Sequence, residues 1–301
     1  MHPAPSVILF SVLSGLGFGM LAWLGIGKPP VTGMSAFIFF FVAYALSVGG
    51  LLSATFHLGN PKNSLKAFSQ WQTSWLSREG CCAIAALTVM GIYAAGAIFL
   101  ETHWMFLGAI GSILSIGTVF TTSMIYAQLK TVPRWNHWTT PLLFVALSIF
   151  GGALMTGQVI VAMYGFVAVG LIQLVAWLTS DNRFTERGST LETATGLGSI
   201  GKVRMFEPPH TGTNYLLKEM VYVIGRKHAL KLRVIAMLLM VVIPVLMIAM
   251  GAGHDIKAVI AVLSHLVGVF ASRWLFFAEA EHVVGLYYGC LLYTSPSPRD
   301  S

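Results

Sequence analysis

Long apolar stretches dominate this chain and alternate with short polar connections. Several of them reach the roughly 18–20 residues that a helix needs to cross a bilayer. Because backbone polar groups in lipid must be paired within their own segment, these stretches are expected to be helices. The pattern predicts an all-α, polytopic membrane helix bundle over residues 1–289. Its eight spans are expected near Val7–Ile26, Met34–Phe56, Cys81–Leu100, Trp104–Ala127, Leu142–Thr156, Ile160–Leu178, Leu232–Met250 and Ala258–Phe277.

Two local patterns refine this prediction. The apolar stretch from Pro141 to Leu178 is too long for one helix, and a tight turn at Gly157–Gln158 would divide it into two spans. Small residues recur at helical spacing in Gly15–Gly19 and again at Gly108 and Gly111. Such residues let helix backbones approach closely in a membrane, so close helix–helix contacts are expected at both places.

Composition supports the same class. The chain has 301 residues, of which 56% are hydrophobic and 10% are charged, whereas soluble domains carry about 25% charged residues. The three cysteines have no spacing typical of a zinc or iron–sulfur site. The net charge of +7 comes from basic residues spread over the connections, so it is explained by membrane topology rather than by binding of nucleic acid.

The basic residues lie mainly in the connections after the second, fourth and sixth spans. An even number of spans places these connections and both termini on one side, and the positive-inside rule predicts that this side is cytoplasmic. The sixth connection, 179–233, is the only sizeable extramembrane segment. Its residues Asn214–Arg226 place apolar side chains on one face, which predicts a helix lying at the membrane interface.

Two patterns that could indicate cofactors carry little weight. Gly196–Gly201 matches the dinucleotide pattern G-x-G-x-x-G, but no strand is expected before it, so we interpret it as a chance match. A haem would need two facing histidines inside the bundle, and His57 with His265 is the pair that the predicted spans allow. An interhelical hydrogen bond is the simpler role for His265. The predicted spans contain no acidic residue, which counts against a proton-coupled transporter.

The densest polar segment, His57 to Glu79, joins the second and third spans. His57 and Glu79 would end neighbouring antiparallel spans on the same side and could therefore face one site. Trp71 and Trp75 are four residues apart and would share a helix face near the headgroups, where an aromatic belt is the alternative explanation. For His57 and Glu79 the alternative is a solvated loop in which Arg78 pairs with Glu79.

The residues of this segment resemble a known family. Phe56–Lys62 (FHLGNPK) and Ser69–Glu79 (SQWQTSWLSRE) are similar to the membrane anchor subunit family of anaerobic dimethyl sulfoxide reductase. Further similar segments are Ala194–Met220, Arg226–Arg233 and Arg273–Gly289, so the resemblance covers about Val7 to Gly289.

This resemblance implies a haem-free, eight-helix anchor in the bacterial cytoplasmic (inner) membrane. It would hold a molybdopterin catalytic subunit and an iron–sulfur electron-transfer subunit at the lipid bilayer. It would bind and oxidise menaquinol in anaerobic respiration and pass the electrons to the iron–sulfur subunit. The family's quinol-site histidine and glutamate fall on His57 and Glu79, beside Arg78, Trp71 and Trp75. With no haem or iron–sulfur cluster expected in this chain, the electron acceptor must belong to a partner.

Two alternatives remain open from the sequence. One is a multi-pass transporter of a small solute, and the other is the anchor of a related molybdoenzyme with another terminal acceptor. The last residues, 290–301, depart from the family and resemble a translated sequencing adapter. We therefore expect this tail to be non-native.

Overall fold

The structure of the chain is a computed structural model that describes residues 2–55, 68–204, 228–251 and 256–288. The described residues form helices and contain no strand. The helices are α1 (Pro5–Gly25), α2 (Gly33–Thr55), α3 (Trp75–Phe99), α4 (Met105–Ala127), α5 (Thr139–Met155), α6 (Val159–Ser180), α7 (Arg183–Glu186), α8 (Leu191–Thr195), α10 (Ala229–Met237), the π segment η3 (Leu238–Val242), α11 (Ile243–Ala249), α12 (Ile256–Ala278) and the 3₁₀ helix η4 (Val283–Tyr288).

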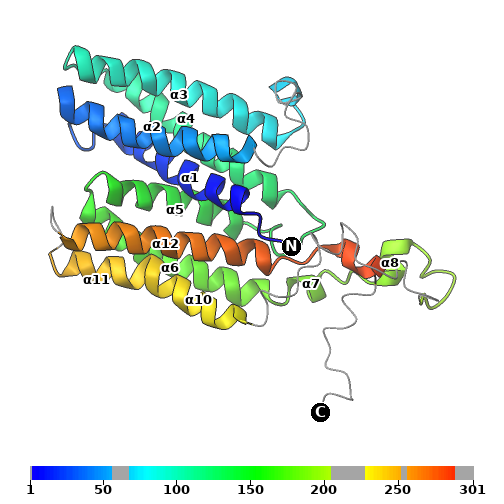
Figure 1. Ribbon diagram of the computed structural model, residues 1–301. Coiled ribbons are helices and arrows are strands. Elements are labelled where there is room, and N and C mark those ends of the chain that lie inside the picture. The colour runs from blue at the N-terminus through cyan, green and yellow to red at the C-terminus, as the bar shows by residue number, and fades with distance from the viewer. Residues whose placement is uncertain (1, 56–67, 205–227, 252–255, 289–301) are drawn as a thin grey trace.

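The predicted polytopic bundle is confirmed. Seven helical segments of the described residues are long and apolar enough to cross a membrane, with α10, η3 and α11 forming one of them, and α5 is a shorter apolar helix. The predicted turn between the fifth and sixth spans is present, and Gly157 adopts φ +75° there. The N-terminus, the start of α3, α7 and α8 all lie at one end of the bundle (Figure 1), as an even number of spans requires. We call this end the loop face.

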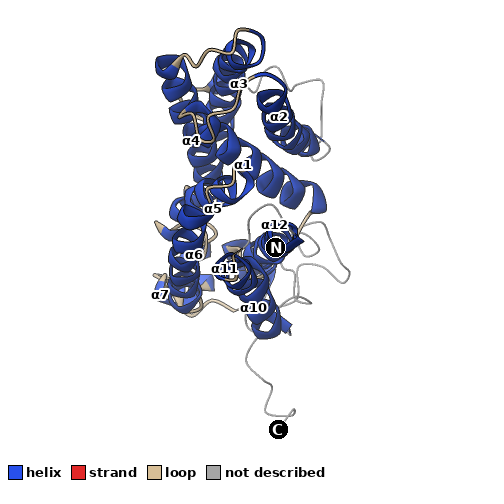
Figure 2. Ribbon diagram, turned by 90° about the vertical axis from the view of Figure 1, so that its left-hand side faces the viewer, coloured by secondary structure: helices blue, strands red, loops and turns tan. Residues whose placement is uncertain are grey.

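Helix α1 lies at the centre of the molecule. Seen end-on, it lies between α2 and α3 on one side and α6 and the C-terminal helices on the other (Figure 2), and α4 and α5 pack against each other beside it. The predicted close contacts through small residues are confirmed along it. A Cβ atom added at Gly19 would lie 1.9 Å from the carbonyl oxygen of Ser148 in α5, and one at Gly25 would lie 2.5 Å from that of Gly108 in α4. Glycine at these positions lets α1 touch both neighbours at backbone distance.

The start of α3 differs from the sequence prediction. The helix begins at Trp75, six residues before the predicted Cys81, because Ser74 caps it by accepting a hydrogen bond from the backbone N–H of Ser77 (3.5 Å). Glu79 therefore lies inside the helix and is 4% exposed. The prediction that no acidic residue lies within a span is wrong for this reason.

The span of α10, η3 and α11 contains a break in its hydrogen-bond pattern. Pro244 has no N–H to donate, and the π segment η3 ends two residues before it. Two carbonyl groups of η3 instead accept hydrogen bonds from α12: Ser264 Oγ donates to Leu239 O (2.8 Å) and His265 Nδ1 donates to Met240 O (2.8 Å). The predicted interhelical hydrogen bond of His265 is thus confirmed.

The described part of the sixth connection holds the short helices α7 and α8. Gly196 ends α8 with φ +71°, a left-handed conformation that favours glycine at a helix C-terminus. A helix rather than a strand precedes Gly196–Gly201, which supports the interpretation of this pattern as a chance match. The predicted interfacial helix Asn214–Arg226 and the tail 290–301 lie outside the described residues.

Candidate functional site

Glu79 is a carboxylate buried between two helices near the loop face. Its Oε1 atom lies 2.5 Å from Thr122 Oγ1 of α4. The Thr122 hydroxyl also lies 2.9 Å from the carbonyl oxygen of Thr118, and its one hydrogen can serve only one of these acceptors. When Glu79 is ionised, Thr122 donates to it. When Glu79 is protonated, its carboxyl group can donate to Thr122, whose hydroxyl then donates to Thr118.

Arg78 points away from its neighbour Glu79. Its Nε atom donates to Trp71 O (2.9 Å), its Nη2 atom donates to Gln72 O (2.6 Å), and its guanidinium carbon lies 4.4 Å from the centre of the Trp75 ring. These contacts fix the turn that precedes α3. The pairing of Arg78 with Glu79 that the sequence allows is not formed, because consecutive helical residues project in different directions.

The two tryptophans lie near the N-terminus of α3, but they do not share a helix face as the sequence predicted. Trp71 lies in the turn before the helix and is 57% exposed, so it does not share a helix face with Trp75. Trp75 is half-buried and packs edge-on against Phe120 of α4, with ring centres 6.2 Å apart. The aromatic rings nevertheless lie at the same end of the bundle as Glu79.

The described residues of the predicted site thus separate into two layers. Trp71, Arg78 and Trp75 form an outer layer at the loop face, and Glu79 forms an inner one with Thr122. His57 lies outside the described residues. Thr122 was missed from the sequence, since its pairing with Glu79 spans 43 residues and has no local signal.

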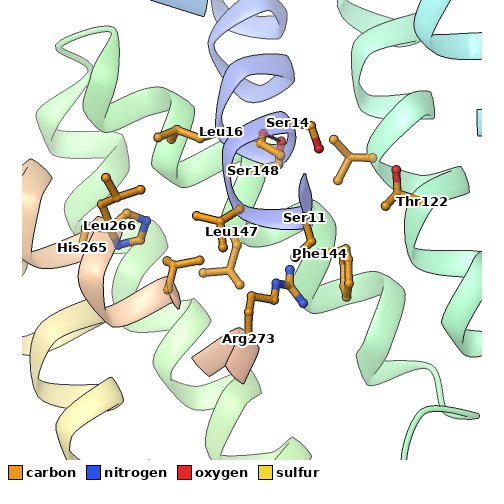
Figure 3. Close-up of a pocket in the computed structure, with 14 residues that line it drawn as sticks. Ser11, Ser14, Leu16, Thr122, Phe144, Leu147, Ser148, His265, Leu266 and Arg273 are labelled. Carbon is orange, nitrogen blue, oxygen red and sulfur yellow. Dashed lines mark hydrogen bonds between the residues drawn. The ribbon is translucent and has the colours of Figure 1, made fainter. Parts of the chain in front are cut away.

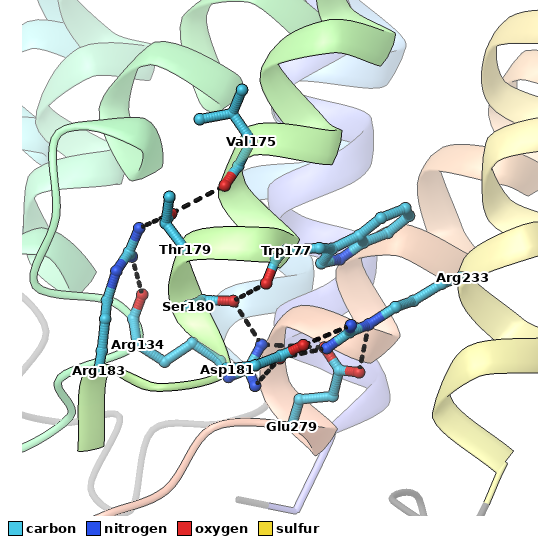
Figure 4. A network of polar contacts seen from close by, with 9 residues as sticks. All are labelled: Arg134, Val175, Trp177, Thr179, Ser180, Asp181, Arg183, Arg233 and Glu279. Carbon is cyan, nitrogen blue, oxygen red and sulfur yellow. Dashed lines mark hydrogen bonds and ion pairs between the residues drawn. The ribbon is translucent and has the colours of Figure 1, made fainter. Parts of the chain in front are cut away.

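A second polar group, absent from the sequence prediction, lies at the loop face on the other side of α1. We call it the charge cluster, and it contains two arginines and two carboxylates from four segments (Figure 4). Arg134 contacts Asp181 at 2.7 Å and Glu279 at 3.2 Å. Arg233 contacts Asp181 at 2.6 Å and Glu279 at 2.8 Å. Each carboxylate therefore bridges both arginines and joins the ends of α6, α10 and α12 to the connection before α5.

The charge cluster shifts the titration of its outer carboxylate. Hydrogen bonds from Arg233, and then hydrogen bonds and charge from Arg134, lower the pKa of Asp181 from its ordinary value of 3.8 to about 2. Nearby, Arg183 donates to the carbonyl oxygen of Arg134 (3.2 Å) and to the hydroxyl of Thr179. Together with the ion pairs of the cluster, these bonds hold the end of α6 to the connection before α5.

A third polar feature lies between Glu79 and the charge cluster. Arg273 of α12 is 5% exposed, and its guanidinium carbon lies 3.4 Å from the centre of the Phe144 ring. Its Nε atom is buried without a hydrogen-bond partner among the described residues. No carboxylate pairs with Arg273 in the described part of the chain, and because a buried arginine is costly in a membrane protein, Arg273 is a candidate for a functional role.

Metal binding finds no support in the described residues. No group of three histidine, cysteine or acidic side chains lies close enough there to hold an ion. The buried His265 uses Nδ1 for its bond to Met240 and stacks on Phe166 with ring centres 4.3 Å apart.

Comparison with known proteins identifies the family. The family described as "DMSO reductase anchor subunit (DmsC)" matches residues 2–289. The chain is also 30% identical to a sulfite dehydrogenase subunit of Allochromatium vinosum over 325 aligned positions, which cover 96% of this chain and 99% of the relative. This chain belongs to the DMSO reductase anchor subunit family. It is a multi-pass membrane anchor subunit of a molybdoenzyme complex, and anchors of this family associate with catalytic and electron-transfer subunits.

The family assignment confirms the resemblance noted in the sequence and decides against a transporter. It draws attention to the loop face of this anchor subunit. Glu79 lies near the start of α3 and the charge cluster lies at the ends of α6 and α12, and these helix ends are all at the loop face (Figure 1).

Proposed function

We propose that this anchor subunit binds menaquinol beside Glu79 and oxidises it, passing the electrons to an iron–sulfur partner subunit. The observation that carries the proposal is the burial of Glu79 with a hydroxyl as its hydrogen-bond partner. In the described part of the chain no ion pair neutralises this carboxylate, so it is available to accept a proton. A proton acceptor of this kind assists the oxidation of a quinol hydroxyl.

The outer layer fits the same role. Trp71 and Trp75 offer aromatic rings on which a quinol ring would stack, and Arg78 holds their turn in place. His57, which precedes this layer in the sequence, would serve as the second proton acceptor because histidine has an ordinary pKa near 6.5. The acceptor of the two electrons is the iron–sulfur subunit, and a molybdopterin subunit would use them to reduce dimethyl sulfoxide.

The location follows from the same proposal. A menaquinol-oxidising anchor belongs in the bacterial cytoplasmic membrane during anaerobic respiration. The basic connections at the loop face predict that this face is cytoplasmic. A reporter that is active only in the cytoplasm should be active when it is fused at Ser199. A reporter that is active only in the periplasm should be active when it is fused at Lys257. Periplasmic activity at Ser199 would reverse the assignment.

Glu79→Gln tests the proposal directly, because it keeps the size and the hydrogen bonding of the side chain and removes the ability to accept a proton. We expect the variant complex to assemble in the membrane. Quinol-dependent reductase activity should fall by roughly 10²- to 10⁴-fold, the range expected for loss of a general base. Activity with an artificial soluble donor should be retained.

Glu101→Gln is the matched control, because Glu101 is exposed in the connection between α3 and α4. It should behave as the wild type in both assays. His57→Ala should resemble Glu79→Gln and should also weaken binding of a quinol-analogue inhibitor. Wild-type quinol oxidation by both Glu79→Gln and His57→Ala would place the site elsewhere in the bundle.

One observation favours a second candidate function. The relative from Allochromatium vinosum is named as a subunit of a sulfite dehydrogenase, and a dehydrogenase delivers electrons rather than consuming them. In this candidate the same site would bind a quinone, and Glu79 would donate a proton to it. An assay of membranes that contain the complex distinguishes the two candidate functions. The first predicts reduction of dimethyl sulfoxide by quinol, and the second predicts reduction of quinone by sulfite.

A further inference from the structure

A small cavity adjoins the hydroxyl that holds Glu79. It has a volume of about 20 Å³ and lies between α1, α4, α5 and α12 (Figure 3). Its polar wall is formed by Thr122, Ser11, Ser14, Ser148, His265 and Arg273. Because the Nδ1 atom of His265 donates to Met240 O, the Nε2 atom of its neutral ring is a hydrogen-bond acceptor.

This first cavity has the size and the polarity to hold water. A single ordered water needs roughly 10–15 Å³ of such volume and two to four polar partners. The hydroxyl groups of Ser11 and Ser148 already donate to the backbone carbonyls of Ile8 and Gly15, so their oxygens remain as acceptors. The guanidinium of Arg273 points into the same space and supplies donors (Figure 3).

A second cavity of about 50 Å³ continues on the other side of Arg273. Arg273 and Phe144 belong to the walls of both cavities. The remaining polar wall of the second cavity includes Gln173, Ser272 and Thr140, and it ends at Glu279 and Arg134 of the charge cluster. The two cavities therefore lie in series between the partner of Glu79 and the charge cluster, with Arg273 and Phe144 between them.

We propose that these two cavities form a hydrated passage through which the proton accepted by Glu79 leaves the bundle. The route runs from Glu79 through Thr122 to water in the first cavity, past Arg273 to water in the second, and then past the ion-paired Glu279 to the loop face. The proton role rests on the proposed function, whereas the hydration of the passage does not.

The chemistry balances in the following way. Oxidation of one quinol to quinone breaks two O–H bonds and releases two electrons and two protons. Both electrons go to the iron–sulfur subunit. One proton binds the Glu79 carboxylate and is then passed to water in the passage, which restores the carboxylate. The other proton is taken by the second acceptor. The guanidinium of Arg273 keeps its own protons and orders the water by donating hydrogen bonds.

Radiolytic labelling tests the hydration without any quinol. Hydroxyl radicals produced by X-rays from bound water modify the side chains next to that water. Phe144 lines both cavities, whereas Phe166 lines neither, and the two rings are equally buried at 3% and 0% exposure. In the assembled complex, we expect Phe144 to be labelled and Phe166 to remain unmodified. Equal labelling of the two rings would overturn the passage, whatever Glu79 does.

Ser272→Val tests the route of the proton. It places methyl groups in the second cavity and removes the hydroxyl that donates to Gln173 (3.1 Å). We expect slower quinol oxidation and a larger solvent isotope effect in D₂O, with unchanged assembly and unchanged binding of a quinol-analogue inhibitor. Thr118→Val is the control, because Thr118 is buried, donates within its own helix to Leu114 O (2.9 Å) and lines neither cavity.

The outcomes separate the two proposals. A wild-type rate and isotope effect in Ser272→Val, with Glu79→Gln inactive, would overturn the proton passage and leave the quinol site intact. Wild-type quinol oxidation by Glu79→Gln would overturn the proton role of the passage together with the proposed site, and the labelling of Phe144 would then still report whether the cavities hold water.

Discussion

Glu79 and Glu279 are equally buried but have different surroundings. Glu79 is 4% exposed and accepts a hydrogen bond from the neutral hydroxyl of Thr122. Glu279 is 5% exposed and bridges two arginines. A carboxylate between two guanidinium groups holds helices together through its ion pairs. A carboxylate beside a hydroxyl can exchange a proton without breaking an ion pair. Of two carboxylates with similar burial, the comparison thus assigns a structural role to Glu279 and a role in proton transfer to Glu79.

The largest expected effect in this comparison is the loss of stability when Glu279 loses its charge. Glu279→Gln leaves the guanidinium groups of Arg134 and Arg233 with Asp181 as their one acidic partner in the described part of the chain. Breaking a buried ion pair costs about 3–5 kcal/mol, and we expect a loss of stability near the lower end, about 3 kcal/mol, because Asp181 remains. Thermal unfolding of the detergent-solubilised complex measures it.

The matched variant Glu79→Gln should leave the unfolding temperature unchanged while slowing quinol oxidation by the roughly 10²- to 10⁴-fold expected for loss of a general base. If the glutamine at position 279 were tolerated and the one at position 79 destabilised the bundle, the two carboxylates would have exchanged roles, and the comparison would be wrong.

The next effect concerns the hydroxyl beside Glu79. Thr122→Val keeps the shape of the side chain and removes the hydrogen bond to the carboxylate, which is worth about 1.5 kcal/mol for an ionised acceptor. Since 1.4 kcal/mol corresponds to tenfold, we expect quinol oxidation to slow by about tenfold. The measurement is the rate of quinol-dependent reduction at saturating acceptor.

Thr118→Val provides the control for this change. Thr118 lies one turn earlier on α4, and its hydroxyl donates within the helix to Leu114 O (2.9 Å). It should oxidise quinol at the wild-type rate. An equal slowing in both variants would assign the effect to helix packing rather than to Glu79.

The smallest expected effect is the loss, at acidic pH, of the stability that the charge cluster contributes. Because the pKa of Asp181 is about 2 in the folded chain and 3.8 ordinarily, its contribution to stability is present above pH 4 and is lost as the pH falls toward 2. Asp181 is 46% exposed, so solvent screening keeps this contribution small. Asp181→Asn should flatten the decrease in thermal stability between pH 5 and pH 3. An unchanged decrease would assign it to other carboxylates.

Much of the fold could be predicted from the sequence because membrane spans are encoded locally. The apolar stretches indicated the seven long apolar helical segments and the shorter helix α5, and small residues such as Gly19 and Gly108 indicated where helices touch. The start of α3 was predicted six residues too late, although Ser74 carries a helix-capping signal that indicates the earlier start. That signal places Glu79 inside the helix.

The polar interior could not be predicted in the same way. Thr122 bonds to a residue 43 positions away, and Arg134 contacts Glu279 across 145 positions. Nothing local in the sequence pairs these residues, since their contacts depend on how the helices pack around α1. The family resemblance indicated Glu79, but the hydroxyl beside it and the charge cluster came only from the arrangement of the helices.

The interrupted helix at Pro244 has a consequence for how the protein is made. The carbonyl groups of Leu239 and Met240 obtain their hydrogen bonds from Ser264 and His265, which are synthesised later. Until those residues arrive, two polar groups of this segment would face lipid at a cost of several kcal/mol each. We therefore expect the last two spans to leave the translocon together as a hairpin. A chain ending at Gly251 should release its final span from the membrane more readily than the same chain with Pro244→Ala.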